Sequence, residues 1–452
     1  MATVDGGRST ATGGARSPLG IVFLVLFLDL VGFSIVFPLY AEMLTHYAAT
    51  DAGVLKYFLD LTKQLHPEAT PFQQAAFFGG LLGAFYSLLQ FLTAPWWGRL
   101  SDRIGRRPVL LISLTGSVLG YAVWVVSHSF LLLILSRLIT GVMSGNVAVA
   151  NAAVADTTTP ETRARSMAVV GMAFGLGFIL GPAIGGLAFT YLPRLDHGWL
   201  LELGFNPFSA PALIALILAF GNWWWAWARF PETLAPERRT MAGSERSANP
   251  LRLFSSTLGR QVPTINLIFL LHTLLFAGVE SMLVFLVAQS LNFTPATTGL
   301  MLGGMGFIAA LMQGGVFRRL APIHGSWPLV LAGFIALVPG FACLALVEWT
   351  GSHWLLHPGV VLMAVGTGLI FPGLSTMASL AGDPQRQGHV MGSFRSAGAL
   401  GRALGPLLAA LVYFSWRPAG PFVVGAIGVL LPAVLMFRLR ALRVEARPEP
   451  AG

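Results

Sequence analysis

The stretch Gly98-Arg-Leu-Ser-Asp102-Arg103-Ile-Gly105-Arg106-Arg107 separates two long apolar runs, near 75–98 and 108–128. A helix that crosses the ~30 Å hydrocarbon core of a bilayer needs ~20 such residues. A short connection between two spans, with four arginines and one acid, predicts a tight charged turn at a membrane surface. We expect Gly105 to provide backbone freedom there and Gly98 to let two helices approach closely. Asp102 can pair with the arginines or cap the start of a neighbouring helix.

The composition extends this interpretation to the whole chain. Of its 452 residues, 55% are hydrophobic and 10% are charged, against ~25% charged in an ordinary soluble domain. So few charges cannot cover the surface of a soluble protein of this size. The single cysteine, Cys343, excludes an internal disulfide and a cysteine-based metal site. The net charge of +9 comes without a basic, aromatic-interleaved stretch, so no nucleic-acid partner is expected.

Ten further apolar runs of span length flank the first two: 19–41, 130–155, 166–192, 209–229, 263–290, 296–317, 327–349, 354–381, 389–414 and 418–438. They predict an all-α membrane protein with twelve transmembrane helices in two pseudo-symmetric six-helix bundles. The expected parts are a tail (1–18), an N-terminal bundle (19–229), a linker loop (230–262), a C-terminal bundle (263–438) and a second tail (439–452). The role of the outer loop, 42–74, cannot be read from its sequence.

The basic residues predict the orientation of these spans. With the N-terminus inside, 21 of the 28 lysines and arginines fall in cytoplasmic segments and four fall in outer loops. Because cytoplasmic loops carry an excess of basic residues, both termini are expected in the cytoplasm, with the protein in the cell (inner) membrane. The remaining three, Arg137, Arg395 and Arg402, lie inside predicted spans. Most tryptophans fall near span ends, which is typical of interfacial aromatic belts.

The two halves of the chain align with each other. With an offset of 220 residues, Gly79 matches Gly299, Gly83 matches Gly303, Gly105 matches Gly325 and Pro108 matches Pro328; with an offset of 224, Gly181-Pro182 matches Gly405-Pro406. Two related bundles joined by a polar loop are the layout of a transporter that alternates access around a central site.

The charged turn closely resembles the loop motif of the major facilitator superfamily. The resemblance implies that it acts as a conformational latch between the bundles, formed by Gly98, Asp102, Arg103, Gly105, Arg106 and Arg107. The second copy, Arg318-Arg-Leu-Ala-Pro322-Ile-His-Gly325, lacks the acid. The latch is therefore expected on one side only.

Two further motifs narrow the resemblance. Gly177-Phe-Ile-Leu-Gly181-Pro182-Ala-Ile-Gly185-Gly186 spaces small residues for close helix packing. It resembles the motif of proton-coupled exporters in the superfamily. Leu133-Ile-Leu-Ser-Arg137 resembles the buried-arginine motif, which implies a role for Arg137 in proton coupling. The whole pattern is similar to the tetracycline-resistance-like drug/proton antiporters, and within them to the animal tetracycline-transporter-like proteins that are associated with organic-anion efflux.

Buried ionisable residues inside spans are functional candidates by default. Asp29 and Glu280 are candidate proton carriers, because burial makes proton uptake by a carboxylate feasible. Arg395 and Arg402 lie seven residues apart, on one helix face, and suit an anionic group. Alternatively, these four charges form static ion pairs. Further candidates for substrate contact are Phe33, Gln90, Gln313 and Asn151.

These observations predict a secondary active transporter, a proton-coupled antiporter that exports amphipathic drugs or organic anions by alternating access. The alternatives are a proton-coupled importer of a sugar or organic acid, a lipid flippase, and a scaffold without flux. The expected partners are a small-molecule substrate, protons and membrane lipids, and the expected state is a monomer. No phosphate-binding loop, nucleophile–base pair or metal-ligand cluster occurs in the sequence, so neither an enzyme nor a cofactor is expected.

Overall fold

The computed structural model describes residues 18–51, 53–158, 160–234, 236, 258–382 and 387–443, and the helices within them account for most of the chain. Their bounds are α1 Pro18–Ser34, η1 Phe37–Leu39, α2 Tyr40–Thr50, α3 Val54–Leu65, α4 Pro71–Ile104, α5 Arg106–Val125, α6 Phe130–Val142, α7 Asn146–Asp156, α8 Pro160–Tyr191, α9 Trp199–Glu202, α10 Ser209–Arg229, α12 Val262–Leu291, α13 Pro295–Leu311, η4 Met312–Phe317, α14 Arg318–His324, α15 Ser326–Thr350, α16 His353–Ala381, α17 Gln387–Ser415, α18 Gly420–Gly428, α19 Leu430–Leu435 and η6 Met436–Arg443. The predicted tails and most of the linker lie outside the described residues.

The all-helical prediction is confirmed. Among the described residues, eleven helical segments are long and apolar enough to cross a membrane. A further apolar segment, Gly175–Tyr191, belongs to α8, at the position of the fifth predicted span. Four of the membrane-crossing segments are built from shorter pieces: α1 with η1 and α2, α6 with α7, α13 with η4 and α14, and α18 with α19 and η6.

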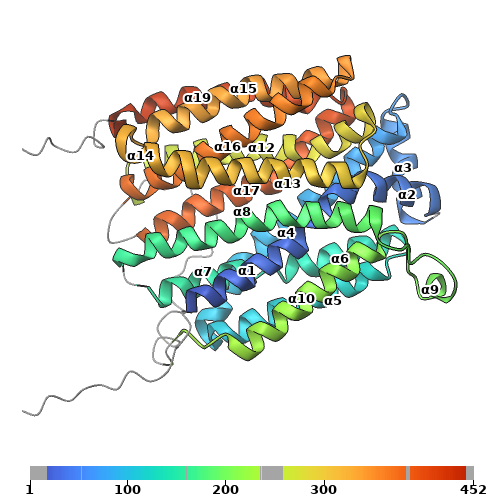
Figure 1. Cartoon of the computed structure of the whole chain (residues 1–452), viewed down its shortest axis with the longest axis horizontal. Helices are drawn as coiled ribbons and strands as arrows, with labels where there is room; N and C mark the ends of the chain where they lie inside the picture. The colour runs from blue at the N-terminus through green and yellow to red at the C-terminus, as the bar shows by residue number, and fades with distance from the viewer. Residues whose placement is uncertain are drawn as a thin grey trace, which may run out of the picture.

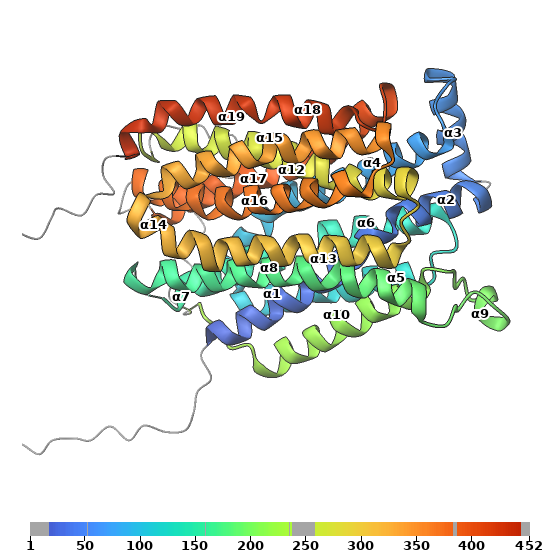
Figure 2. The ribbon, with the colours of Figure 1, turned by 45° about the horizontal axis from the view of Figure 1, so that its top comes forward.

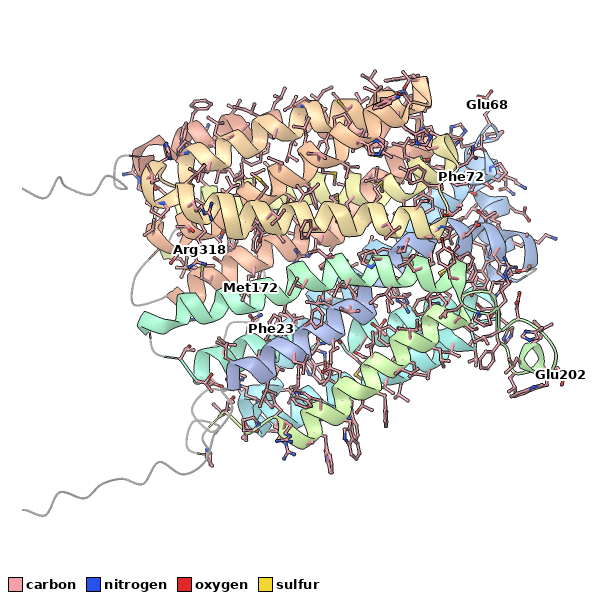
Figure 3. All side chains as sticks on the ribbon, in the orientation of Figure 1. Phe23, Glu68, Phe72, Met172, Glu202 and Arg318 are labelled. Atoms are coloured by element: carbon pink, nitrogen blue, oxygen red, sulfur yellow. The ribbon has the colours of Figure 1, made fainter. Side chains whose placement is uncertain are left out.

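The helices form two packed groups whose spans run alongside one another. Helices of the first half of the chain, blue to green, lie on one side, and those of the second half, yellow to red, lie on the other (Figures 1 and 2). The start of α1 and α14 lie at one end of the bundles, here named the arginine-rich end. The other end, named the α3 end, carries α2, α3 and α9. Figure 3 places Arg318 at the first end and Glu68 and Glu202 at the second.

The two groups meet most tightly toward the α3 end, through glycines. A Cβ added to Gly80 of α4 would collide with Ala410 and with the Pro406 carbonyl group of α17. A Cβ added to Gly299 of α13 would collide with the Pro182 carbonyl group of α8. Each contact thus sets a glycine of one helix against the Gly-Pro step of the other bundle. We call these two contacts the glycine seams.

The turn glycines of the repeat also match in the structure. Gly105 ends α4 and precedes α5 with φ 106° and ψ 161°. Gly325 ends α14 and precedes α15 with φ 78° and ψ 168°. Side chains rarely adopt such φ values, so glycine is required at both turns. The backbone freedom predicted at Gly105 is therefore present, and it recurs 220 residues later.

The tryptophan belts are only partly as predicted. Trp96, Trp224, Trp349, Trp354 and Trp416 are exposed at the helix ends, as interfacial residues would be. Two others are buried instead, because each indole N–H has a backbone acceptor inside the protein. Trp97 Nε1 donates to the Val142 carbonyl oxygen at 2.7 Å, and Trp327 Nε1 donates to the Met436 carbonyl oxygen at 2.8 Å.

Candidate functional site

The charged turn is organised around Arg106, which is almost fully buried. Its Nη1 lies 2.6 Å from Asp102 Oδ1 and 2.7 Å from Ser101 Oγ, and its Nε lies 2.8 Å from Asp156 Oδ2. Asp156 is the last residue of α7. A buried guanidinium needs compensating acceptors, and here they come from two helices. Arg106 therefore ties α7 to the turn between α4 and α5.

A second acid reaches this turn from beyond α10. Glu232 accepts hydrogen bonds from the backbone N–H groups of Arg106 at 2.9 Å and Arg107 at 3.2 Å. These are orphan donors at the start of α5, so the carboxylate caps the helix and opposes its positive end. Arg107 Nη2 also donates to the Trp227 carbonyl oxygen at 2.7 Å. Asp102 was expected either to pair with the arginines or to cap a neighbouring helix; it pairs with Arg106, and Glu232 caps α5.

Two of the predicted latch residues behave differently from expectation. A Cβ added to Gly98 would have nothing within 4 Å, so the close helix approach predicted there is wrong for this conformation. Arg103 is exposed and makes no hydrogen bond or ion pair with any described residue. The bonds described above join α4, α5, α7 and the segment after α10, all within the first half of the chain.

The close packing predicted for α8 is confirmed. Gly177, Gly181 and Gly185 lie directly against α1, where added Cβ atoms would collide with Leu30, Ser34 and the Ile35 carbonyl group. Ser34 Oγ crosses the interface and donates to the Gly177 carbonyl oxygen at 3.0 Å. Gly186 faces the other bundle, against the Pro295 carbonyl group.

Asp29 lies on the same helix, α1, and is held by neutral groups. Ser117 Oγ of α5 donates to Asp29 Oδ1 at 3.4 Å, and the side chain of Asn146 on α7 is a polar neighbour that favours the ionised form of this carboxyl group. Among the described residues, no arginine nitrogen lies within 4.0 Å of it. The alternative of a static pair between Asp29 and Arg395 or Arg402 is therefore not what the structure has.

Arg137 is buried in an aromatic environment within the first bundle. Its guanidinium carbon lies 4.8 Å from the Trp124 ring centroid and 5.9 Å from the Tyr121 ring centroid. Its Nη2 donates to Ser136 Oγ at 3.1 Å, while its Nε has no hydrogen-bond partner in the part of the chain that the structure describes. Desolvated cation–π contacts compensate part of the cost of burying this charge. Tyr121 also interacts electrostatically with Asp29, so it is near both charged residues.

Arg395 joins the two bundles. Its Nη1, on α17, donates to Asn151 Oδ1, on α7, at 2.5 Å, across 244 positions of sequence. Asn151 lies five residues before Asp156, or about 7.5 Å along the helix axis. The bond is therefore in the half of the span nearer the arginine-rich end, on the other side of the bundle centre from the glycine seams.

Glu280 and Arg402, together with Arg395 and its partner Asn151, make up a set that we call the charged group. Arg402 interacts electrostatically with both Glu280 of α12 and Arg395. No nitrogen–oxygen distance under 4.0 Å joins Glu280 and Arg402. Glu280 is half-buried, whereas the Arg402 side chain is exposed although it lies mid-helix. Arg402 thus has an opposite charge nearby but no ion pair within 4.0 Å among the described residues.

The uncharged candidates separate into two groups. Phe33 stacks on Tyr86 with ring centroids 4.6 Å apart and meets Phe178 edge-on at 6.2 Å, so α1, α4 and α8 share an aromatic cluster. Gln90 on α4 and Gln313 on η4 are half-buried, and neither has a hydrogen bond with a described residue. The structure thus links Arg395 to Asn151 by a hydrogen bond and Arg402 to Glu280 by charge, and gives neither glutamine a hydrogen bond to a described residue.

Comparison with known proteins gives consistent relatives over nearly the whole chain. A family model described as Major Facilitator Superfamily matches residues 22–406. The mouse "Major facilitator superfamily domain-containing protein 10" is 35% identical over 451 residues, covering 94% of this chain and 93% of the mouse protein. The "Tetracycline resistance protein, class B" of Escherichia coli is 28% identical over 437 residues, covering 97% and 98%.

Solved structures agree. The crystal structure of the human organic anion transporter MFSD10 (TETRAN) matches with a TM-score of 0.74 and 33% identity, covering 94% of this chain and 100% of the human one. An inward-facing bacterial homolog of the human lysosomal transporter Spinster matches with a TM-score of 0.68 at 14% identity, covering 97% and 100%. The second likeness shows the shared fold.

Proposed function

Because the chain belongs to the major facilitator superfamily and is a multi-pass membrane transporter rather than an enzyme, we propose that it is a proton-coupled antiporter that exports amphipathic organic anions. Relatives named as tetracycline resistance proteins and as an organic anion transporter support this direction and substrate class. The arginine distribution supports cytoplasmic termini and a cytoplasmic arginine-rich end. The observation that carries the proposal is the charged group formed by Arg395, Arg402, Glu280 and Asn151 between the bundles.

In this proposal the arginines of α17 bind the anionic group of the substrate. Arg402 is exposed, and Glu280, the opposite charge near it among the described residues, is farther than contact distance. A planar fork of donors suits a carboxylate, sulfonate or phosphate. The aromatic cluster at Phe33 offers an apolar surface for the rest of an amphipathic molecule. Glu280 then serves as the counter-charge that the substrate anion replaces beside Arg402.

Protonation of Glu280 and protonation of Asp29 would couple proton movement to anion movement in opposite directions. Protonation of Glu280 removes the negative charge beside Arg402, so it strengthens anion binding, and by reciprocity the anion favours protonation. Because proton binding and anion binding favour each other at this site, the anion and the proton would move in the same direction. Exchange in opposite directions needs a proton site elsewhere, and Asp29 is the candidate, because it lies in the other bundle and has only neutral partners among the described residues.

Helix α7 connects the proposed proton site to the proposed substrate site. The Asn146 side chain interacts with the Asp29 carboxylate, and Asn151, five residues along the same helix, accepts from Arg395. Protonation of Asp29 weakens the first of these interactions, because a neutral carboxyl is a poorer acceptor than a carboxylate. A small shift of α7 then reaches Arg395 and the contact between the bundles.

The test is transport of a fluorescent organic anion by the full-length protein in proteoliposomes with an imposed pH gradient. Wild-type protein should move the anion against its gradient, in the direction opposite to proton flow. Asp29→Asn should abolish this accumulation while retaining anion exchange at equal pH. Arg402→Gln should weaken binding of the anion, whereas Glu280→Gln should tighten it.

Three outcomes would contradict the proposal. Accumulation in the direction of proton flow would indicate an importer. Unchanged coupling in Asp29→Asn would remove Asp29 from the proton path. Unchanged anion affinity in both Arg402→Gln and Glu280→Gln would remove the arginine site.

A further inference from the structure

Helix α3 carries three separate stripes of side chains along its twelve residues. Leu55, Leu59 and Thr62 face the protein, and Leu55 and Thr62 are 1% and 5% exposed. Lys56, Asp60, Lys63 and Gln64 are exposed and form a polar stripe at spacings of four, three and one. Tyr57, Phe58 and Leu61 form an apolar stripe that is also open, at 69%, 40% and 41% exposed. We call it the apolar stripe of α3.

The position of α3 sets its surroundings. Figure 2 shows α3 running across the α3 end of the bundles, transverse to the spans. Phe58 meets Phe78 of α4 with ring centroids 6.2 Å apart, and Leu81, one turn further along α4, is exposed on a membrane-spanning helix. The apolar stripe therefore adjoins surface that a bilayer covers.

The far end of α3 reaches the second bundle. His66, the residue after α3, meets Phe414 of α17 edge-on with ring centroids 5.5 Å apart, and Phe77 of α4 lies 5.1 Å from the same ring. Trp416, two residues further, is exposed at this end of the bundle, as expected of an interfacial residue. α3 thus ends at the level of the lipid headgroups and beside the glycine seam between α4 and α17.

We propose that α3 is an interfacial helix that inserts its apolar stripe into the headgroup region of the leaflet at the α3 end. An amphipathic helix lies in the membrane plane when its apolar side chains reach ~5–10 Å below the headgroups and its polar side stays in water. Lys56 and Lys63, the only two lysines of the chain, can extend their ammonium groups to lipid phosphates from the polar stripe. The bilayer, rather than a second protein or a lid, covers the apolar stripe.

As a consequence, lipid contacts that hold α3 in the leaflet also restrain the glycine seam between α4 and α17. When the bundles separate at the α3 end, Phe414 moves relative to α4, and the contact with His66 has to break or carry α3 along. Lipid contact with α3 therefore opposes opening at this end. The proposal does not depend on the identity of the substrate or on proton coupling.

The experiment measures the depth of each stripe in the full-length protein in nanodiscs of phosphatidylethanolamine and phosphatidylglycerol. Cys343→Ser supplies a background without cysteine. Single cysteines at Tyr57 and Leu61 report on the apolar stripe, and matched cysteines at Asp60 and Gln64 report on the polar stripe. Each carries a nitroxide whose accessibility to oxygen and to a water-soluble nickel chelate is measured by power saturation.

We expect the ratio of oxygen to nickel accessibility to be several-fold higher at Tyr57 and Leu61 than at Asp60 and Gln64. Quenching of a fluorophore at Leu61 by lipids brominated near the headgroup provides a second measurement. Equal, high nickel accessibility at all four positions would overturn the proposal, since the apolar stripe would then be open to water. Low accessibility to both reagents at Tyr57 and Leu61 would also overturn it, because protein rather than lipid would cover them.

Discussion

The bond between Asn151 and Arg395 offers the most direct test of how the bundles are held at the arginine-rich end. Asn151→Ala removes the acceptor from a guanidinium 2.5 Å away. A hydrogen bond to a charged group contributes ~1.5–3 kcal/mol, which corresponds to a ~10- to 150-fold change in an equilibrium constant. The population of the conformation described here should fall by this factor relative to conformations in which α7 and α17 are apart.

Asn151→Asp is the matched variant of opposite sign. Its carboxylate presents an acceptor in the same place and adds an attractive charge beside Arg395 and Arg402. We therefore expect this variant to favour the joined conformation over the wild-type distribution. Both substitutions alter the same side chain, and Asp matches Asn in size, so a general loss of packing cannot explain a gain in the Asp variant.

The assay is the distance distribution between spin labels on the two bundles. Ile104 at the end of α4 and Ile323 on α14 are exposed, at 42% and 71%, and can carry the labels in the Cys343→Ser background. Asn151→Ala should enlarge the population that differs from the wild-type main distance, and Asn151→Asp should reduce it. A shift of less than threefold in both variants, or the same shift in both, would refute the role assigned to this bond.

Five further substitutions, in three tests, probe the structural elements around the site by thermal unfolding in detergent. Gly105→Ala forces a side chain into positive φ and should cost ~1–2 kcal/mol; Gly98→Ala, where a Cβ meets nothing within 4 Å, should be neutral or stabilise by ~0.5–1 kcal/mol. Equal effects of these two would contradict the assigned turn geometry. Gly185→Ala should lower the unfolding temperature more than Gly175→Ala, because only the former meets the backbone of α1; the reverse order would show that α1 yields freely. Glu232→Ala should cost ~0.5–2 kcal/mol through the lost cap of α5, and no change would mean that solvent replaces the carboxylate.

Much of the fold follows from patterns that depend on composition and local geometry. Apolar run lengths set the spans because the bilayer imposes one thickness. The repeat predicted equivalent turns, and Gly105 and Gly325 both have the conformation that only glycine adopts readily. Close packing on α8 was predictable because small residues every four positions leave a flat helix face, as at Gly177 and Gly181.

The site was less predictable because it depends on how helices are rotated and which ones meet. Nothing in the sequence links Asn151 to Arg395, 244 positions away. The aromatic surroundings of Arg137 depend on Trp124, which has no motif of its own. Glu232 belongs to a recognisable Phe-Pro-Glu-Thr-Leu stretch, but its partners are backbone N–H groups, and these carry no sequence signal. The proton and substrate roles of the buried charges remain predictions.

The glycine seams indicate how the protein could be trapped in one conformation. Each seam consists of a glycine against a carbonyl group, as at Gly80 with Pro406 and Gly299 with Pro182, so separating it breaks dispersion contacts and no side-chain hydrogen bond. Closure at the two glycine seams thus depends on steric fit. A single methyl group added at Gly80 or at Gly299 would keep its seam from closing. Because the two seams are related by the repeat, either substitution would trap the same open conformation, although the two positions are far apart in the sequence.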